Sequence, residues 1–427
     1  NAAGQYNVHS PVDLTTLPVN ASPSGVGAGG MARVTSSGTQ YDATSDGTNF
    51  TLANWTALGT QFSGGTSSFT TNAGNIALNN VNFSATNGGL SVRTNHLGAG
   101  AVTQTAASTL NLGTGALSIQ ANGAVLLDTA SFGSLSASVG NSGFGSAGRQ
   151  VIGGSTVFGV ASFNANTINA NTGAFNVTSL GAINTGALPV GSVNLTAYSG
   201  GVNTGTLGTG VNPLSNATIN TAATFSGGGN ITTGAIEANS LSLNARANTI
   251  TVGGAGTINA VNTGASSVSI SNGSQVGAGT ITVGAINANS VTLRGDGTIT
   301  TGNINAASAA PSSISFFSNG TISTGSLDAG SITSSDNFCC GLFAPAAITV
   351  VGAIGGNFAG TNLYLRAGTL SIGGNVTLDP TQAGTVQLES LGGTNLTINS
   401  GNGVLTAGDG SSFFLKATDI AEALHLS

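Results

Sequence analysis

The sequence has very little charge. Of its 427 residues, 13 are Asp or Glu and 7 are Lys or Arg, so charged residues make up 5% of the chain and the net charge is −6. About 25% is usual for a soluble domain. Lys416 is the single lysine, and the cations form no cluster. Because a nucleic-acid backbone is bound by clustered cations that displace its counterions, we expect no nucleic-acid partner.

Proline is also scarce, and long apolar runs are missing. With 8 prolines against 68 glycines, the chain is neither a collagen nor a proline-rich linker. A hydrophobic content of 39% argues against disorder. No apolar run reaches the roughly 20 residues that span a bilayer, so we expect no transmembrane segment. The chain starts at Asn1 and its only methionine is Met31. We therefore expect a processed chain that is secreted or displayed at the cell surface.

The only two cysteines, Cys339 and Cys340, are adjacent. A metal site would need further Cys or His at ligand spacing, and the three histidines are scattered, so we expect no metal and no cofactor. Three interpretations of the pair remain open. The thiols are inert at a turn, they bond to a neighbouring subunit, or they close a disulfide between adjacent residues.

Strand-forming and turn-forming residues fill most of the chain, and they recur. "ITTGAIEANSLSLNA" (231–245) returns as "ITVGAINANSVTLRG" (281–295), 50 residues later, with nine of fifteen positions identical. Shorter versions begin at Ile183, Val202, Ile231, Val261, Ile281, Ile299 and Ile322. Their spacing is irregular but close to 20, as in a solenoid whose coils accept insertions, so the 50-residue repeat spans two or three coils.

The apolar residues of these units alternate with polar ones. In "NSVTLRG" Val291 and Leu293 flank Thr292, so the aliphatic side chains share one face of a short strand. Glycine and asparagine suit the corners. We predict an all-β fold, a parallel and right-handed β-helix with coils of about 20 residues. An antiparallel β-sandwich array is the alternative.

The repeats resemble those of a known family. "GNITTGAIEANSLSLNARANTITVGGAGTINA" and "GTITTGNINAASAAPSSISFFSNGTISTGSLDAG" are similar to the degenerate repeats of filamentous-haemagglutinin-like exoproteins. The resemblance covers residues 160–400 and implies a large secreted bacterial β-helix. The secretion domain of that family, with its NPNG-type motif, is not recognisable.

Composition divides the chain into three parts. Residues 1–65 are predicted to be an N-terminal cap or an arm that reaches another subunit, and 66–400 the solenoid. A bulky insert at 334–351, which carries the cysteines, interrupts the solenoid. The tail, 401–427, contains "TDIAEALHL", whose spacing is helical. It is expected to cover the end of the solenoid or to dock on the next molecule.

The residues show little sign of catalysis. Carbohydrate-active β-helices need several carboxylates in one groove, and here 13 are spread along the chain. We expect no enzyme, although a carbohydrate-active one is kept as a third alternative. Arg294, Gly295 and Asp296 spell RGD, a tripeptide that adhesins use for integrin contact, on a predicted turn. A Gly-Asp-Gly turn accounts for the same residues without a receptor. Outward threonines suggest ice binding, but the variable coil lengths argue against the flat array that it requires.

A structural role is therefore the first expectation. The chain would be a secreted subunit that assembles head-to-tail with copies of itself into an extracellular fibre, sheath or biofilm matrix. The alternative is the shaft of a bacterial surface adhesin that contacts a host receptor or glycan.

Overall fold

The fold is known from a computed structural model. It describes residues 20–21, 28–36, 39–46, 50–53, 66–71, 75–84, 87–94, 100–140, 150–152, 155–157, 161–169, 171–198, 200–209, 213–221, 229–245, 248–253, 258–259, 266–272, 279–295, 297–306, 312–335, 345–356, 362–378, 385–390, 396–398, 404–406, 412–416 and 425–426. These residues form strands and turns and no helix. The chain divides into two compact units, Asn1–Gly208 with Thr221–Gly229, and Thr209–Asn220 with Asn230–Ser427.

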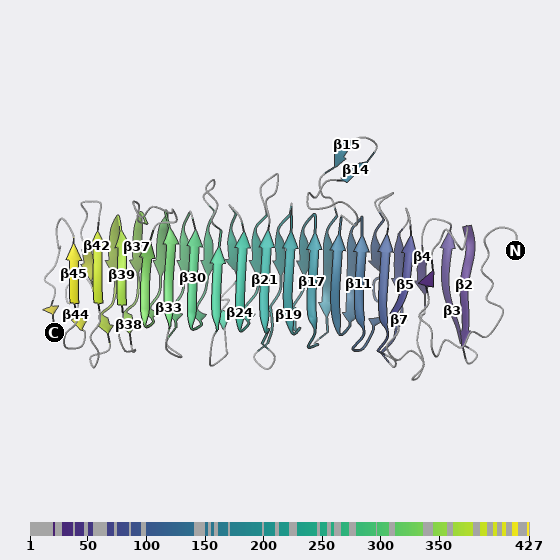
Figure 1. Cartoon of the computed structure of the whole chain (residues 1–427), viewed down its shortest axis with the longest axis horizontal. Helices are drawn as coiled ribbons and strands as arrows, with labels where there is room; N and C mark the ends of the chain where they lie inside the picture. Colours follow the sequence, from purple (N-terminus) through teal and green to yellow (C-terminus); the bar gives the residue numbers. More distant parts are fainter. Residues whose placement is uncertain are drawn as a thin grey trace. The chain divides into compact units, whose positions relative to one another are not determined.

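The first unit is built on two sheets, here called A1 and B1. Within each sheet, strands from successive coils lie side by side (Figure 1). Sheet A1 contains β1 (Asn20–Ala21), β5 (Thr66–Thr71), β8 (Gly89–Thr94), β11 (Ala116–Ala121), β13 (Ser134–Val139), β17 (Ala174–Ser179) and β19 (Ser192–Ala197). Sheet B1 contains β2 (Ala28–Ser36), β3 (Thr39–Asp46), β4 (Phe50–Ala53), β6 (Ile76–Asn79), β7 (Val81–Asn82), β9 (Val102–Gln104), β10 (Leu110–Asn111), β12 (Val125–Ser131), β16 (Phe163–Ile168), β18 (Ile183–Thr185) and β20 (Val202–Thr204).

Antiparallel pairing in this unit is confined to two places among the described residues. β2, β3 and β4 run antiparallel to one another, and β4 then pairs with β6 in parallel. β14 (Gln150–Ile152) and β15 (Ser155–Val157) form a separate two-stranded antiparallel hairpin. The predicted cap or arm at 1–65 therefore contains strands, and its role stays a prediction.

The second unit has three sheets, here called A2, B2 and C2. Sheet A2 contains β21 (Asn216–Thr221, the last residue grouped with the first unit), β24 (Ser240–Ala245), β27 (Ser267–Ser271), β30 (Ser290–Gly295), β33 (Ser313–Ser318), β36 (Ser331–Ser335), β39 (Asn362–Ala367), β42 (Thr385–Ser390) and β45 (Ser412–Lys416). Sheet B2 contains β22 (Ile231–Thr233), β25 (Ile250–Val252), β28 (Ile281–Val283), β31 (Ile299–Thr301), β34 (Thr321–Thr324), β37 (Ala347–Val350), β40 (Thr369–Ile372) and β43 (Leu396–Ile398). Sheet C2 contains β23 (Ile236–Glu237), β26 (Ile258–Asn259), β29 (Ile286–Asn287), β32 (Ile304–Asn305), β35 (Leu327–Asp328), β38 (Ile354–Gly356), β41 (Val376–Leu378), β44 (Val404–Thr406) and β46 (His425–Leu426).

Parallel pairing from coil to coil confirms the predicted β-helix and excludes the β-sandwich. Short coils are close to the expected length of about 20 residues. Ile314, for example, pairs with Ile332, and 332 − 314 = 18. Longer coils carry more residues between the paired strands, as where Ile332 pairs with Leu363 in the next coil. The long repeat spans two coils, because Ile231 pairs with Ile250 and Ile250 with Ile281. The repeat proposed at Val261 lies outside the described residues, and Ile250 takes its place in the register.

Aliphatic columns form the core. The column of sheet B2 stacks one residue from each of seven successive strands, none of them more than 1% exposed: Ile231, Ile250, Ile281, Ile299, Ile322, Ile348 and Leu370. Burying each such side chain stabilises the fold by about 1.5–3 kcal/mol. This explains why the repeats keep the isoleucines, since each one contacts its equivalents in two neighbouring coils.

The Thr-Gly pairs of the repeats form the corners. The buried hydroxyl of Thr301 donates to the carbonyl oxygen of Gly302, and Thr204, Thr233 and Thr324 do the same to the glycines that follow them. A Cβ on Gly302 would lie 3.0 Å from the backbone nitrogen of Ala285 in the neighbouring coil, a tight contact that favours glycine there. The corner thus satisfies an inward hydroxyl that would otherwise be buried without a partner.

Two predicted segments differ in extent from the structure. The insert at 334–351 is shorter at both ends, because Ser334 and Ser335 complete β36 and Ala347–Val350 is β37. In the tail, residues 417–424 lie outside the described residues, and His425–Leu426 is a strand paired with β44 rather than part of a helix.

Candidate functional site

The outward face of sheet A2 changes in character along the stack. In strands β24 to β36 its first column is serine throughout: Ser240, Ser267, Ser290, Ser313 and Ser331. In β39 and β42 the outward positions instead carry Tyr364, Arg366, Gln387 and Glu389, here called the charged patch. It brings an aromatic ring, an amide and two charges together on a face otherwise lined mainly by small hydroxyl side chains.

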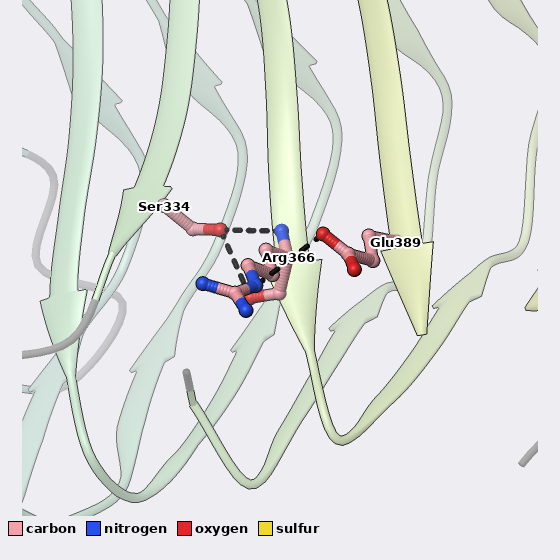
Figure 2. Close-up of polar contacts among 3 residues, drawn as sticks. All are labelled: Ser334, Arg366 and Glu389. Atoms are coloured by element: carbon pink, nitrogen blue, oxygen red, sulfur yellow. Dashed lines mark hydrogen bonds and ion pairs between the residues drawn. The ribbon is translucent and has the colours of Figure 1, made fainter. Parts of the chain in front are cut away.

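An ion pair joins the two strands of the charged patch. Arg366 Nε lies 3.3 Å from Glu389 Oε2 (Figure 2), without the alignment of a hydrogen bond. The side chains are 29% and 8% exposed, so water screens the attraction less than at an open surface. The next residue in register after Glu389 is Lys416. The carboxylate is therefore placed between two cationic positions of one column.

Ser334 anchors Arg366 from the other side. Its hydroxyl accepts a hydrogen bond from the backbone nitrogen of Arg366 at 2.9 Å and donates to the carbonyl oxygen of Arg366 at 3.3 Å (Figure 2). The regular pairing of β36 with β39 is recorded only as far as Thr333 and Tyr364. The serine hydroxyl thus takes the place of a ladder bond near the end of β36 and ties this strand to Arg366 of β39.

A second polar column lies on sheet C2. Its register places Glu237, Asn259, Asn287, Asn305 and Asp328 in successive coils. Burial raises the pKa of the Asp328 carboxyl above its ordinary value. The two carboxylates are four coils apart, or about 19 Å at the spacing of neighbouring strands, too far to act together on one bond.

We predict that Asp328→Asn stabilises the second unit at pH 7 but not at pH 3. A raised pKa means that the folded state holds the proton more tightly, so the wild type loses stability as pH rises from the ordinary carboxyl value of 3.8 through the raised value. Asparagine removes this loss and extends the asparagine column. Thermal unfolding at both pH values measures the difference in stability between the variant and the wild type. Asn305→Asp, which adds a carboxyl to the same column, is the converse variant. Equal melting temperatures for Asp328→Asn and wild type at pH 7 would contradict the assignment.

Asp128 in the first unit has a structural role. It accepts hydrogen bonds from Asn166 Nδ2 at 3.0 Å and from the backbone nitrogen of Ala107 at 3.1 Å, and these two bonds lower the pKa of its carboxyl. Ala107 has a φ of 60°, a conformation that a non-glycine residue rarely adopts. The carboxylate therefore holds a turn in place and is not poised as a catalytic acid.

The structure describes only some of the site residues predicted from the sequence. Arg294 and Gly295 are the last two residues of β30, so they are not on a turn as predicted. Arg294 is exposed and Gly295 is buried, and Asp296 lies outside the described residues, as do Cys339 and Cys340. The adhesive role of the tripeptide and the state of the cysteines stay predictions. The charged patch was missed, although one strand, "NLYLRA", carries both an aromatic and a charged residue.

Within the described ranges, no group of three or more His, Cys, Asp or Glu side chains is placed to hold a metal ion. The same ranges contain no helix long and apolar enough to cross a membrane. No family model, curated protein or solved structure matches the chain. The class of the protein is thus set by its architecture, a parallel β-helix, and the resemblance to filamentous-haemagglutinin-like exoproteins stays a prediction.

Proposed function

We propose that the chain is a secreted structural protein, a self-assembling subunit of an extracellular fibre, sheath or biofilm matrix. The observation that carries the proposal is the combination, in each unit, of a core of stacked aliphatic side chains with outward columns of uncharged serine, threonine and asparagine. Coils bonded to one another in this way make a stiff and protease-resistant element. Few outward charges leave little repulsion against close packing of neighbouring copies.

The partner in this proposal is another copy of the chain. A head-to-tail contact that does not close on itself generates a filament. The joints would be the two end segments, 1–65 and 401–427, and the insert with Cys339 and Cys340, which the sequence composition sets apart. A disulfide between copies would make the contact permanent in an oxidising extracellular environment.

A surface adhesin shaft is the second candidate, and the charged patch favours it. Carbohydrate-binding surfaces combine an aromatic side chain, which stacks on a sugar ring, with amide and charged groups that hydrogen-bond its hydroxyls. Tyr364, Gln387 and Arg366 supply these groups on neighbouring strands. Arg294 adds an exposed cation at an equivalent column position of β30.

Negative-stain electron microscopy of the purified chain, with and without reductant, tests the structural role. We expect uniform filaments in oxidising buffer that are lost on reduction and in the double variant Cys339→Ser, Cys340→Ser. The matched control is Ser335→Cys without reductant, which adds a thiol at the half-buried last residue of β36 and should still assemble. Isolated particles under every condition would reject self-assembly. Glycan binding that is lost in Tyr364→Ala would then support the adhesin.

A further inference from the structure

Sheet B2 presents two parallel columns of hydroxyl side chains, here called the hydroxyl array. The first column holds the residue before the buried aliphatic residue in six successive strands, β25, β28, β31, β34, β37 and β40: Thr249, Thr280, Thr298, Thr321, Ala347 and Thr369. The array begins after β22, where the equivalent residue is Asn230. The second holds the residue after it: Thr251, Thr282, Thr300, Ser323, Thr349 and Ser371. Eleven of the twelve positions therefore carry a hydroxyl, and none carries a charge.

The array faces outward. Because side chains alternate across a strand, the residues on both sides of a buried isoleucine point away from the core. Thr282, Thr298, Thr300, Thr321 and Thr349 are exposed, and Thr251 is half-buried. Neighbouring hydroxyls lie within hydrogen-bonding distance along the first column, 3.4 Å from Thr280 to Thr249 and 3.1 Å between Thr298 and Thr321.

Strand propensity alone does not account for these threonines. Threonine favours strands more than serine does, and it should do so on every sheet of the same coils. Yet threonine fills nine of the twelve array positions. On sheet A2 the strands β27, β30, β33, β36 and β39 have fifteen outward positions, and only two of them, Thr292 and Thr333, are threonine. Serine is the commonest residue at the others. The threonine methyl and hydroxyl are thus concentrated on one sheet.

Variable coil length does not disturb the array. Ile281 pairs with Ile250 across a long coil and with Ile299 across a short one, and the three stay in register. The extra residues lie between the paired strands in the sequence and do not shift their register, so variable coil length is compatible with a regular array. Neighbouring strands lie about 4.7–4.9 Å apart, and positions i and i+2 along a strand about 6.6 Å apart. The array is therefore a regular two-dimensional lattice of neutral hydroxyl and methyl groups.

We propose that the hydroxyl array binds the surface of ice. Crystal planes of ice repeat their oxygen atoms in one direction at a distance close to the spacing of neighbouring strands. Threonine hydroxyls hydrogen-bond water, while their methyl groups leave neighbouring water molecules bonded to one another. Water held in this pattern joins an advancing crystal face, and the adsorbed protein blocks further growth there. This inference does not depend on the proposed assembly into a fibre.

The chemistry of the array favours this occupant over others. A sugar-binding platform uses aromatic rings, and none of the twelve positions is aromatic. An acidic or basic partner would need opposite charges, which are absent from the same positions. A neutral and periodic surface is complementary to a neutral and periodic lattice of water.

The test measures ice growth with the full chain and two matched variants. Thr300→Tyr places a bulky ring in the middle of the array. Thr377→Tyr makes the same change at an exposed threonine of β41, on sheet C2 of the same unit. The measurements are thermal hysteresis, the shape of single ice crystals, and partition of the protein into a growing ice front. Circular dichroism melting checks that both variants fold.

We expect the wild type to shape ice and to enter it. Thr377→Tyr should match the wild type, and Thr300→Tyr should lose most of the hysteresis, because its ring keeps the neighbouring hydroxyls away from the ice surface. A wild type that leaves ice growth unchanged, or equal activity in the two variants, would overturn the proposal. Adsorption to crystalline chitin or cellulose in the absence of any effect on ice would overturn it too. If Thr300→Tyr does not fold, Thr300→Val, which keeps the shape and removes one hydroxyl, replaces it.

Discussion

Replacing Ile281 by asparagine is expected to destabilise the second unit by about 4 kcal/mol or more. Ile281 is fully buried between Ile250 and Ile299, so the change removes the aliphatic contacts and leaves an amide without a partner in the column. Chemical denaturation followed by circular dichroism measures the loss. A loss of this size is larger than that of most single substitutions, and it is enough to unfold a protein of marginal stability.

The neighbouring residue provides the control. Thr282 follows Ile281 in β28 but is exposed, and Thr282→Asn should change stability by no more than about 0.5 kcal/mol. The two variants introduce the same side chain one position apart on one strand. Similar losses in both would mean that the faces of sheet B2 are wrongly assigned, because a shift of one residue exchanges the two faces.

Phe175→Ala is expected to destabilise the first unit by about 3–5 kcal/mol. The Phe175 ring is fully buried, with its centroid 6.0 Å from that of Phe163 in an edge-on arrangement and 6.3 Å from that of Phe132. Truncation would remove both ring contacts and leave a cavity that the stacked backbone cannot close, since its coils are held by ladder bonds on both sides.

Leu126→Ala is the matched variant for Phe175→Ala. Leu126 belongs to β12 of the same unit but is 40% exposed, so we expect a loss below about 1 kcal/mol. The two losses are compared from the midpoints of urea unfolding, with the same dependence of the unfolding free energy on urea concentration used for both variants. If Phe175→Ala lost no more unfolding free energy than Leu126→Ala, the packing of Phe175 against Phe132 and Phe163 in the core would be contradicted.

Much of the fold could be predicted from local sequence patterns. In "NSVTLRG" the alternation of Val291 and Leu293 with Thr292 predicted a strand with one buried face, and the structure buries both aliphatic residues. The Thr-Gly pairs predicted corners, and Thr301 with Gly302 forms one. Both patterns depend on residues close together in the chain, whose geometry is set by backbone sterics.

The candidate site was harder to predict because it depends on neighbours from different coils. Arg366 and Glu389 belong to successive coils, and the separation in sequence between paired residues varies from coil to coil in the same sheet. The RGD tripeptide shows that a local pattern can also be misinterpreted. A tripeptide read as a turn proved to have its first two residues at the end of β30, because pairing with β27 and β33 extends the strand.

The sequence by itself determined the kind of coil, the inward aliphatic residues and the low outward charge, since each depends on residue type and on spacing within a few positions. The tertiary structure alone decided which residues of successive coils lie side by side. It paired Arg366 with Glu389, lined up the threonines from Thr249 to Thr369, and left the differences in coil length between the paired strands. The physical reason is that hydrogen bonds between coils fix the register of the strands, while the loops between strands vary in length without disturbing it.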